Sequence, residues 1–117
     1  MEIARGTRFT IDARHGTGPE AAIAADITAA MSTVVDPELG IDLATLQLVQ
    51  EIEWTGSALA IRFVFTTPFC PYGPTLMAEM ERALTEVLLV PFALVLLPQA
   101  YDPPDEVKSL LGLPGYW

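Results

Sequence analysis

The sequence predicts an α+β domain of two layers, a small sheet covered by helices on one face. Three observations support this prediction. Two segments carry apolar residues at helical spacing, two shorter segments alternate with a turn between them, and a nearly continuous apolar run follows the second helix. The predicted order is helix, strand, strand, helix, strand, helix. At 117 residues the chain forms one domain that is long enough to bury a core.

The first helix is predicted to begin at Gly18 and Pro19, because proline suits the first helical position. Pro37 ends it, because a proline disfavours helical geometry in the residue before it. One face of this helix is apolar and carries Ile23, Ile27, Ala30, Met31 and Val34.

The next two segments read as strands joined by a hairpin turn at 55–57, where the sequence is Thr-Gly-Ser. Alternate residues in each segment are large and apolar, which is typical of strands with one buried face. These residues are Leu46, Leu48, Ile52 and Trp54 in the first strand, and Leu59, Ile61, Phe63 and Phe65 in the second.

A second helix is predicted from about Pro71 to about Leu89, with a turn after it at Val90 and Pro91. Its apolar stripe consists of Leu76, Met80, Ala83, Leu84 and Val87. The run from Phe92 to Leu97 predicts a strand buried on both faces. A last short helix begins near residues 102–104, Asp-Pro-Pro, and ends at Gly112.

Residues 1–18 form an N-terminal extension before a single domain at 19–117. Ile3, Phe9 and Ile11 are compatible with a strand, whereas residues 15–18, His-Gly-Thr-Gly, are typical of a loop. The composition of this extension allows it to be mobile.

The chain is acidic, with 15 Asp and Glu against 6 Lys and Arg and a net charge of -9. Such a surface repels phosphate backbones and anionic lipid, so we expect no nucleic acid or membrane partner. A single cysteine excludes an intrachain disulfide, and the N-terminus lacks the apolar region of a signal peptide. The longest apolar run, 87–97, is shorter than the roughly 20 residues of a membrane span. We expect a cytoplasmic protein.

Cys70 lies in the run 66–71, Thr-Thr-Pro-Phe-Cys-Pro, between a predicted strand and a predicted helix. Unpaired N–H groups at a helix start favour a thiolate, the form that attacks electrophiles and binds soft metals. The alternative is a small buried apolar residue, which most free cysteines are. The boundary position favours function. The only histidine, His15, lies in the extension and gives little support to a Cys–His pair.

Asp36, Pro37 and Glu38 place carboxylates in a second predicted loop. Alone, this run is what many helix ends look like, with Glu38 solvated. A single thiol is a poor metal site, because structural zinc and iron–sulfur clusters normally take four ligands. The composition therefore permits a weak or transient site made of Cys70 with Asp36 or Glu38, or a site shared by two Cys70 thiolates in a homodimer.

Residues 35–41, Val-Asp-Pro-Glu-Leu-Gly-Ile, and residues 66–71 together resemble the metal–sulfur cluster assembly family that includes SufT and PaaD-type proteins. Residues 101–104 and 110–112 resemble the tail of that family, so the resemblance covers roughly 20–113. It implies the same order of elements and a role in maturing iron–sulfur proteins as an assembly or delivery factor, not an enzyme. It implies transient binding of iron or an iron–sulfur cluster, with scaffold or client proteins as partners.

The resemblance also implies a pocket in which Cys70 is joined by Asp36, Glu38, Leu39, Thr66 and Thr67. The chain departs from the family at three positions. Thr45 and Gln47 replace an aspartate and a glycine before the first strand, and Tyr101 stands where the family often has tryptophan.

The leading hypothesis is an iron–sulfur assembly accessory factor with Cys70 as the ligand. Three alternatives stay open. The protein could be a thiol-dependent enzyme or redox sensor that uses Cys70, an interaction module in which Cys70 is structural, or a PaaD-like accessory protein of a multicomponent oxygenase.

Overall fold

A computed structural model describes residues 3–37, 39–66 and 72–110. Four strands form one mixed sheet in the order β1-β2-β3-β4. They are β1 (Arg8–Phe9), β2 (Val49–Trp54), β3 (Leu59–Phe63) and β4 (Phe92–Leu96). The helical elements are η1 (Ile11–His15), α1 (Pro19–Met31), α2 (Leu43–Leu46), α3 (Gly73–Val87) and α4 (Asp105–Leu110). This is the predicted α+β architecture, with β1, η1 and α2 in addition.

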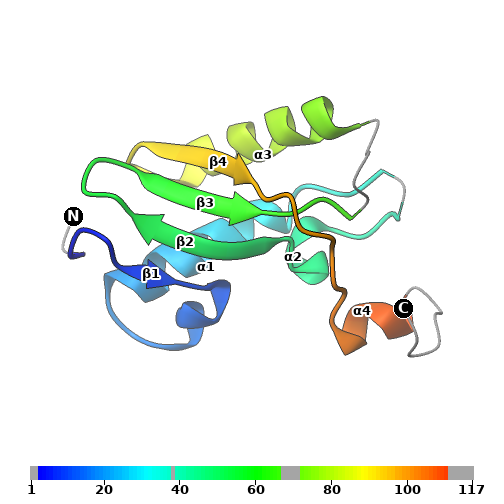
Figure 1. Ribbon diagram of the computed structural model, residues 1–117, viewed down its shortest axis with the longest axis horizontal. Coiled ribbons are helices and arrows are strands. Elements are labelled where there is room, and N and C mark those ends of the chain that lie inside the picture. Colours follow the sequence, from blue (N-terminus) through cyan, green and yellow to red (C-terminus); the bar gives the residue numbers. More distant parts are fainter. Residues whose placement is uncertain (1–2, 38, 67–71, 111–117) are drawn as a thin grey trace.

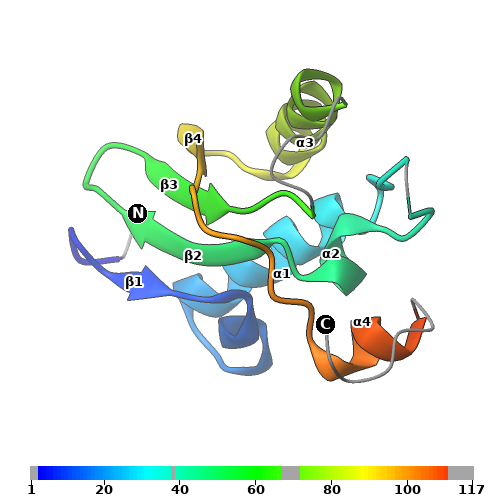
Figure 2. The same cartoon turned by 45° about the vertical axis from the view of Figure 1, so that its right-hand side comes forward.

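In Figure 1, α1 lies behind β2 and β3 and α3 runs above β4, while neither long helix covers the face of the sheet that is turned toward the viewer. β2 pairs antiparallel with both β1 and β3, whereas β3 and β4 are parallel. Parallel neighbours need a crossover connection, and α3 provides it. The turned view in Figure 2 shows α3 beside β4 and α1 behind β2.

The core lies between the sheet and the two helices. Its largest fully buried side chains come from every layer: Ile27, Met31, Leu43, Leu46, Leu48, Ile52, Leu59, Ile61, Phe63, Leu76, Met80 and Leu84. The predicted apolar positions of both helices and of the hairpin strands thus supply most of it. Tyr101 and Val107 are also buried, so the chain after β4 packs against the same core.

The open face of the sheet carries a network of four charged side chains on three adjacent strands. Arg62 donates to Glu51 Oε1 at 3.0 Å and to Glu53 Oε1 at 2.9 Å. Arg8 on β1 lies 3.9 Å and 3.6 Å from the same two carboxylates. Alternating signs across neighbouring strands stabilise the sheet on the face without helices.

Residues 3–9 pack against the sheet. Ile3 is buried, Gly6 donates its N–H to the Trp54 carbonyl at 2.7 Å, and Trp54 donates back to Thr7 at 3.0 Å. The sequence allowed either a strand or a loop in this segment, and a short strand is formed at Arg8 and Phe9. The division into an extension at 1–18 and a domain at 19–117 stays a prediction.

Three local predictions were wrong. α1 ends at Met31 instead of near Pro37, and the buried Val34 follows it in a loop. Leu46 belongs to α2 instead of the first strand, because Asp42 caps a short helix there by accepting from the Thr45 N–H at 3.0 Å.

The third wrong prediction concerns β4, which is not buried on both faces. It is the outermost strand of the sheet, and Ala93, Val95 and Leu96 are exposed. An apolar run indicates a strand but not its place in the sheet, because that place is set by the crossover through α3. Among the described residues, no helix has the length and apolar character needed to cross a bilayer.

Candidate functional site

The loop after α1 is closed by backbone hydrogen bonds. Asp36 donates its N–H to the Ile41 carbonyl at 2.9 Å, and Gly40 donates to the Asp36 carbonyl at 2.8 Å. Val35 and Asp42 form an isolated antiparallel bridge at its base. Gly40 has φ +69°, a conformation that glycine adopts without steric cost. These bonds hold the loop in one conformation and direct the Asp36 side chain inward.

Asp36 is 1% exposed and is the only buried charged side chain among the described residues. Its Oδ1 accepts a hydrogen bond from the Leu39 N–H at 3.2 Å, and its Oδ2 accepts one from the Thr66 hydroxyl at 3.0 Å. A buried carboxylate is tolerated only where donors satisfy it. The two predicted motifs, 30 residues apart in sequence, therefore meet at this carboxylate.

Thr66 is positioned by the end of β3 and the start of α3. Val64 donates its N–H to the Leu48 carbonyl at 3.0 Å, and the Phe65 ring packs edge-on against Phe63 with centroids 5.4 Å apart. Gly73 begins α3 against the same ring, because a Cβ there would lie 3.2 Å from Phe65 Cε2. The residues after β3 and the first residue of α3 therefore lie next to each other, on either side of the Phe65 ring.

Of the six predicted pocket residues, the structure brings together Asp36, Leu39 and Thr66. Glu38, Thr67 and Cys70 lie outside the described residues, and their place in the pocket stays a prediction. Within the described part of the chain, no three His, Cys, Asp or Glu side chains gather in a way that could hold a metal ion. The hydrogen bonds that Asp36 accepts from Leu39 and Thr66 join the two loops.

Tyr101 is a further residue near this site, and the sequence showed it only as a departure from the family. Its hydroxyl donates to the Leu46 carbonyl at 2.6 Å. Burial, and then the charges of Asp102 and Asp36, raise the pKa of Tyr101 from 10.0 to about 12. The hydrogen bond from Tyr101 to Leu46 joins the segment after β4 to α2.

Gln47 is the only non-glycine residue with positive φ among those described. It caps the C-terminal end of α2 with φ 56° and ψ 48°, the left-handed conformation for which glycine is preferred. Its side-chain Nε2 donates to Glu106 Oε2 at 3.3 Å, and its carbonyl accepts from Gln50 Nε2 at 3.0 Å. This backbone geometry explains the preference for glycine at the position that Gln47 occupies in this chain.

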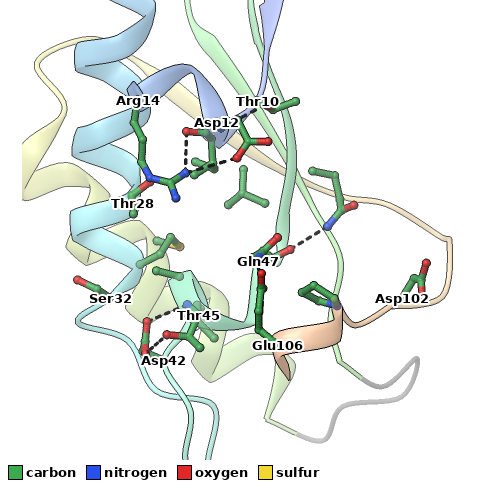
Figure 3. A pocket seen from close by; sticks show the side chains of 17 residues that line it. Thr10, Asp12, Arg14, Thr28, Ser32, Asp42, Thr45, Gln47, Asp102 and Glu106 are labelled. Carbon is green, nitrogen blue, oxygen red and sulfur yellow. Dashed lines mark hydrogen bonds and ion pairs between the residues drawn. The ribbon is translucent and has the colours of Figure 1, made fainter. Parts of the chain in front are cut away.

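A cavity of about 730 Å³ opens between η1, α1, α2 and the chain around α4 (Figure 3). Arg14 folds back onto η1, where it donates to the Ile11 carbonyl at 3.0 Å and lies 3.7 Å from Asp12, whereas Asp42 and Glu106 lie on the other side of the cavity. Of the predicted pocket residues that the structure describes, Asp36, Leu39 and Thr66, none lines it. This cavity is therefore separate from the contacts that Asp36 makes with Leu39 and Thr66, and its polar groups largely bind one another.

A family model for iron–sulfur cluster assembly proteins matches residues 24–90, more than half of the chain. The Fe-S protein maturation auxiliary factor YitW of Bacillus subtilis is 35% identical over 69 residues, covering 58% of this chain and 68% of that protein. An iron-sulfur cluster carrier protein of Deinococcus radiodurans is 36% identical over 50% of this chain, but the match takes up only 17% of that protein.

The Fe-S protein maturation auxiliary factor SufT of Staphylococcus aureus is 33% identical over 46% of this chain and 62% of its own length. A crystal structure of a domain of unknown function from Bacillus anthracis shares the fold, with a TM-score of 0.65 and 23% identity. The structural match covers 80% of this chain and 95% of the Bacillus anthracis domain. On these matches, and with the predicted motifs within the matched residues, the chain belongs to the iron–sulfur cluster assembly protein family.

Proposed function

We propose that this protein is an accessory factor in the maturation of iron–sulfur proteins, and that it holds iron or an iron–sulfur cluster transiently as cargo through Cys70. Family membership and the names of its relatives, maturation auxiliary factors and a cluster carrier, support the general role. The finer role rests on the hydrogen bond between Thr66 and Asp36.

That bond is 3.0 Å long and joins the loop 35–42 to the residue directly before the segment 67–71, which contains the only thiol of the chain. A thiolate is the soft ligand that iron and iron–sulfur clusters take up. The bond fixes the residue from which this segment starts, so the Asp36 loop controls where the thiol-bearing segment begins.

In this proposal Cys70 is the ligand, and Asp36 is a positioning residue that acts through Thr66 and Leu39. Glu38 and Thr67 contribute an oxygen ligand or hydrogen bonds to the cargo. One protein thiolate leaves most coordination positions of iron open, because clusters normally take four. Weak ligation of this kind suits a protein that passes its cargo to a scaffold or client protein, with no reaction of its own.

The charge distribution is consistent with protein partners. A net charge of -9 opposes binding to nucleic acid and to anionic membranes. We place the protein in the cytoplasm, where thiols stay reduced. A homodimer bridged by two Cys70 thiolates remains one form in which the cargo could be held.

The test is anaerobic reconstitution with ferrous iron and sulfide, followed by absorption and Mössbauer spectroscopy and by transfer to an apo-protein that needs a [4Fe–4S] cluster. We expect the wild type to show thiolate-to-iron charge transfer and to activate the client. Cys70→Ala should lose both. Asp36→Asn should bind iron with lower occupancy while its thiol is still titratable, because the positioning contact is weakened and the ligand is kept.

A matched control moves the thiol. Ala29 is exposed on α1, and the double variant Cys70→Ser with Ala29→Cys keeps one accessible cysteine. We expect no recovery of iron binding or client activation in it. Equal spectra and equal activation in the wild type, Cys70→Ala and the double variant would reject the ligand role of Cys70.

A further inference from the structure

The outer edge of β4 is unpaired among the described residues, because β3 is the only strand beside it. Leu97 donates its N–H to Phe63, and the Pro91 carbonyl accepts from Leu59, so odd-numbered residues direct their backbone groups toward β3. Backbone direction alternates along a strand. The N–H and C=O groups of Phe92, Leu94 and Leu96 therefore face outward, ready to form a further ladder.

Within β4, the described chain carries none of the residues that usually block strand addition, and Pro91 and Pro98 lie outside the strand on either side. Residues 87–101 contain no charged side chain, and no proline interrupts β4 itself. Natural edge strands are commonly protected by lysine, proline, a bulge or a covering element. Here Val95 is 37% exposed and Leu96 is 47% exposed.

A groove of about 580 Å³ runs between the start of β4 and the adjacent flank of α3. Glu81 and Thr85 form its helical wall, and Leu88, Phe92 and Leu94 form its apolar floor. Leu89, which is fully exposed, lies at its end. Among the described residues that line this groove, Glu81 is the only charged one.

We propose that β4 accepts an extended segment of another protein as a fifth strand of the sheet. The segment would pair antiparallel with β4 and direct alternate side chains toward the groove. Apolar side chains suit the floor made by Phe92 and Leu94, and a lysine or arginine suits Glu81. This is strand addition to a sheet edge beside a helix, in which the ladder supplies affinity and the groove supplies specificity.

The charge of the groove favours such a partner over a second copy of this chain. Two copies paired through β4 about a two-fold axis would place both α3 flanks on the same side of the joint. Each copy would then bring its own Glu81 to the same face of a joint between two molecules that each carry a net charge of -9. A five-residue edge is also short of the roughly 800 Å² per partner that a stable dimer buries.

The experiment uses the full chain, ¹⁵N-labelled, and the peptide acetyl-Thr-Val-Thr-Lys-Thr-Val-Thr-amide. We expect slower amide exchange at Phe92, Leu94 and Leu96 on binding, and little change at Ala93 and Val95, which already face β3. Residues paired directly across an antiparallel ladder lie on the same face. Methylating the lysine backbone nitrogen should therefore abolish binding, whereas methylating the nitrogen of a neighbouring threonine should not.

Glu81→Lys should weaken peptide binding about two- to tenfold, as expected for loss of a surface ion pair. Glu86→Lys is the matched control, because it makes the same charge change on α3 away from this groove and should leave affinity unchanged. Replacing the peptide lysine with glutamate should reverse the preference between wild type and Glu81→Lys.

Three results would overturn the proposal. They are equal loss of binding from either methylation, amide changes located away from β4, and dimerisation of the free protein through β4 in sedimentation equilibrium. Repeating the titration with Cys70→Ser separates this inference from the proposed function, because strand addition needs no thiol and should persist in that variant.

Discussion

The backbone at Gln47 is left-handed, which explains why the family resemblance would place a glycine at this position, where this chain has glutamine. A left-handed residue other than glycine is strained by about 1 kcal/mol, and the bond from Gln47 to Glu106 returns part of that cost. We expect Gln47→Gly to leave the free energy of unfolding unchanged or to raise it by up to about 1 kcal/mol. Gln47→Val should lower it by more than about 1 kcal/mol, because a β-branched side chain tolerates positive φ poorly. Urea unfolding of the three proteins measures both changes, and equal stability of the glycine and valine variants would contradict the explanation.

Tyr101 links stability to alkaline pH. Its folded pKa, about 12, lies above the unfolded value of 10.0, so the protonated form is favoured in the folded state. Its contribution is fully present below pH 10 and is lost as pH rises through 12, by roughly 2–3 kcal/mol. At pH 8, Tyr101→Phe should cost about 1–2 kcal/mol, because the Leu46 carbonyl loses its donor.

Unfolding of wild type and Tyr101→Phe should be measured from pH 8 to 12. We expect the difference between them to shrink above pH 10, since only the wild type has this group to ionise. A difference that stays constant over this range would show that Tyr101 titrates normally in the folded protein.

Among the elements, the open face of the sheet depends on Arg62. It lies between Glu51 and Glu53 on the neighbouring strand, with hydrogen bonds of 3.0 and 2.9 Å. Arg62→Ala would leave two carboxylates close together, with only Arg8 near them at more than 3.5 Å. We expect a loss of about 1–2 kcal/mol at low salt and a smaller loss in 1 M NaCl, where the Debye length falls to about 3 Å.

Arg8→Ala is the natural comparison, because Arg8 is more exposed and makes longer contacts with the same carboxylates. Its cost should be below about 1 kcal/mol. Denaturant unfolding at two salt concentrations distinguishes the two arginines, and a cost for Arg62→Ala that is independent of salt would point to packing instead of charge.

Element by element, the sequence predicted what local patterns can specify. Pro19 begins α1, the turn at 55–57 joins β2 and β3, and Leu76, Met80 and Leu84 are buried in α3 as their spacing indicated. The predicted strand at β4 is formed, but its predicted burial on both faces was wrong, because an apolar run does not specify which strands lie beside it. Neither the helix α2 nor the left-handed backbone at Gln47 was predicted from the sequence. Both belong to one capped turn of four residues, which is too short to give a periodic pattern.

At the scale of the molecule, the family resemblance predicted the fold and the family, and the structure and comparisons confirm both. The contact between Asp36 and Thr66 joins residues 30 apart, so no local pattern could have shown it. Composition supported an acidic domain and excluded a disulfide framework, but it could not choose between Cys70 as ligand and Cys70 as a buried residue. That choice is still a proposal, because Cys70 lies outside the described residues.

The two edges of the sheet differ in how much of the neighbouring strand they leave available for pairing. At one edge, the two-residue strand β1 pairs with Ile52 and Glu53 of β2, whereas the outer edge of β4 has no partner strand in the described chain. The opposite edge of the sheet is β1, whose two residues offer little for another strand to pair with. Deleting residues 1–17 would remove β1 and leave the six-residue strand β2 as a second long edge, so that copies of the protein could pair edge to edge in both directions. We therefore expect the shortened protein to form filaments or precipitate where the full chain stays dispersed, which light scattering over time would reveal.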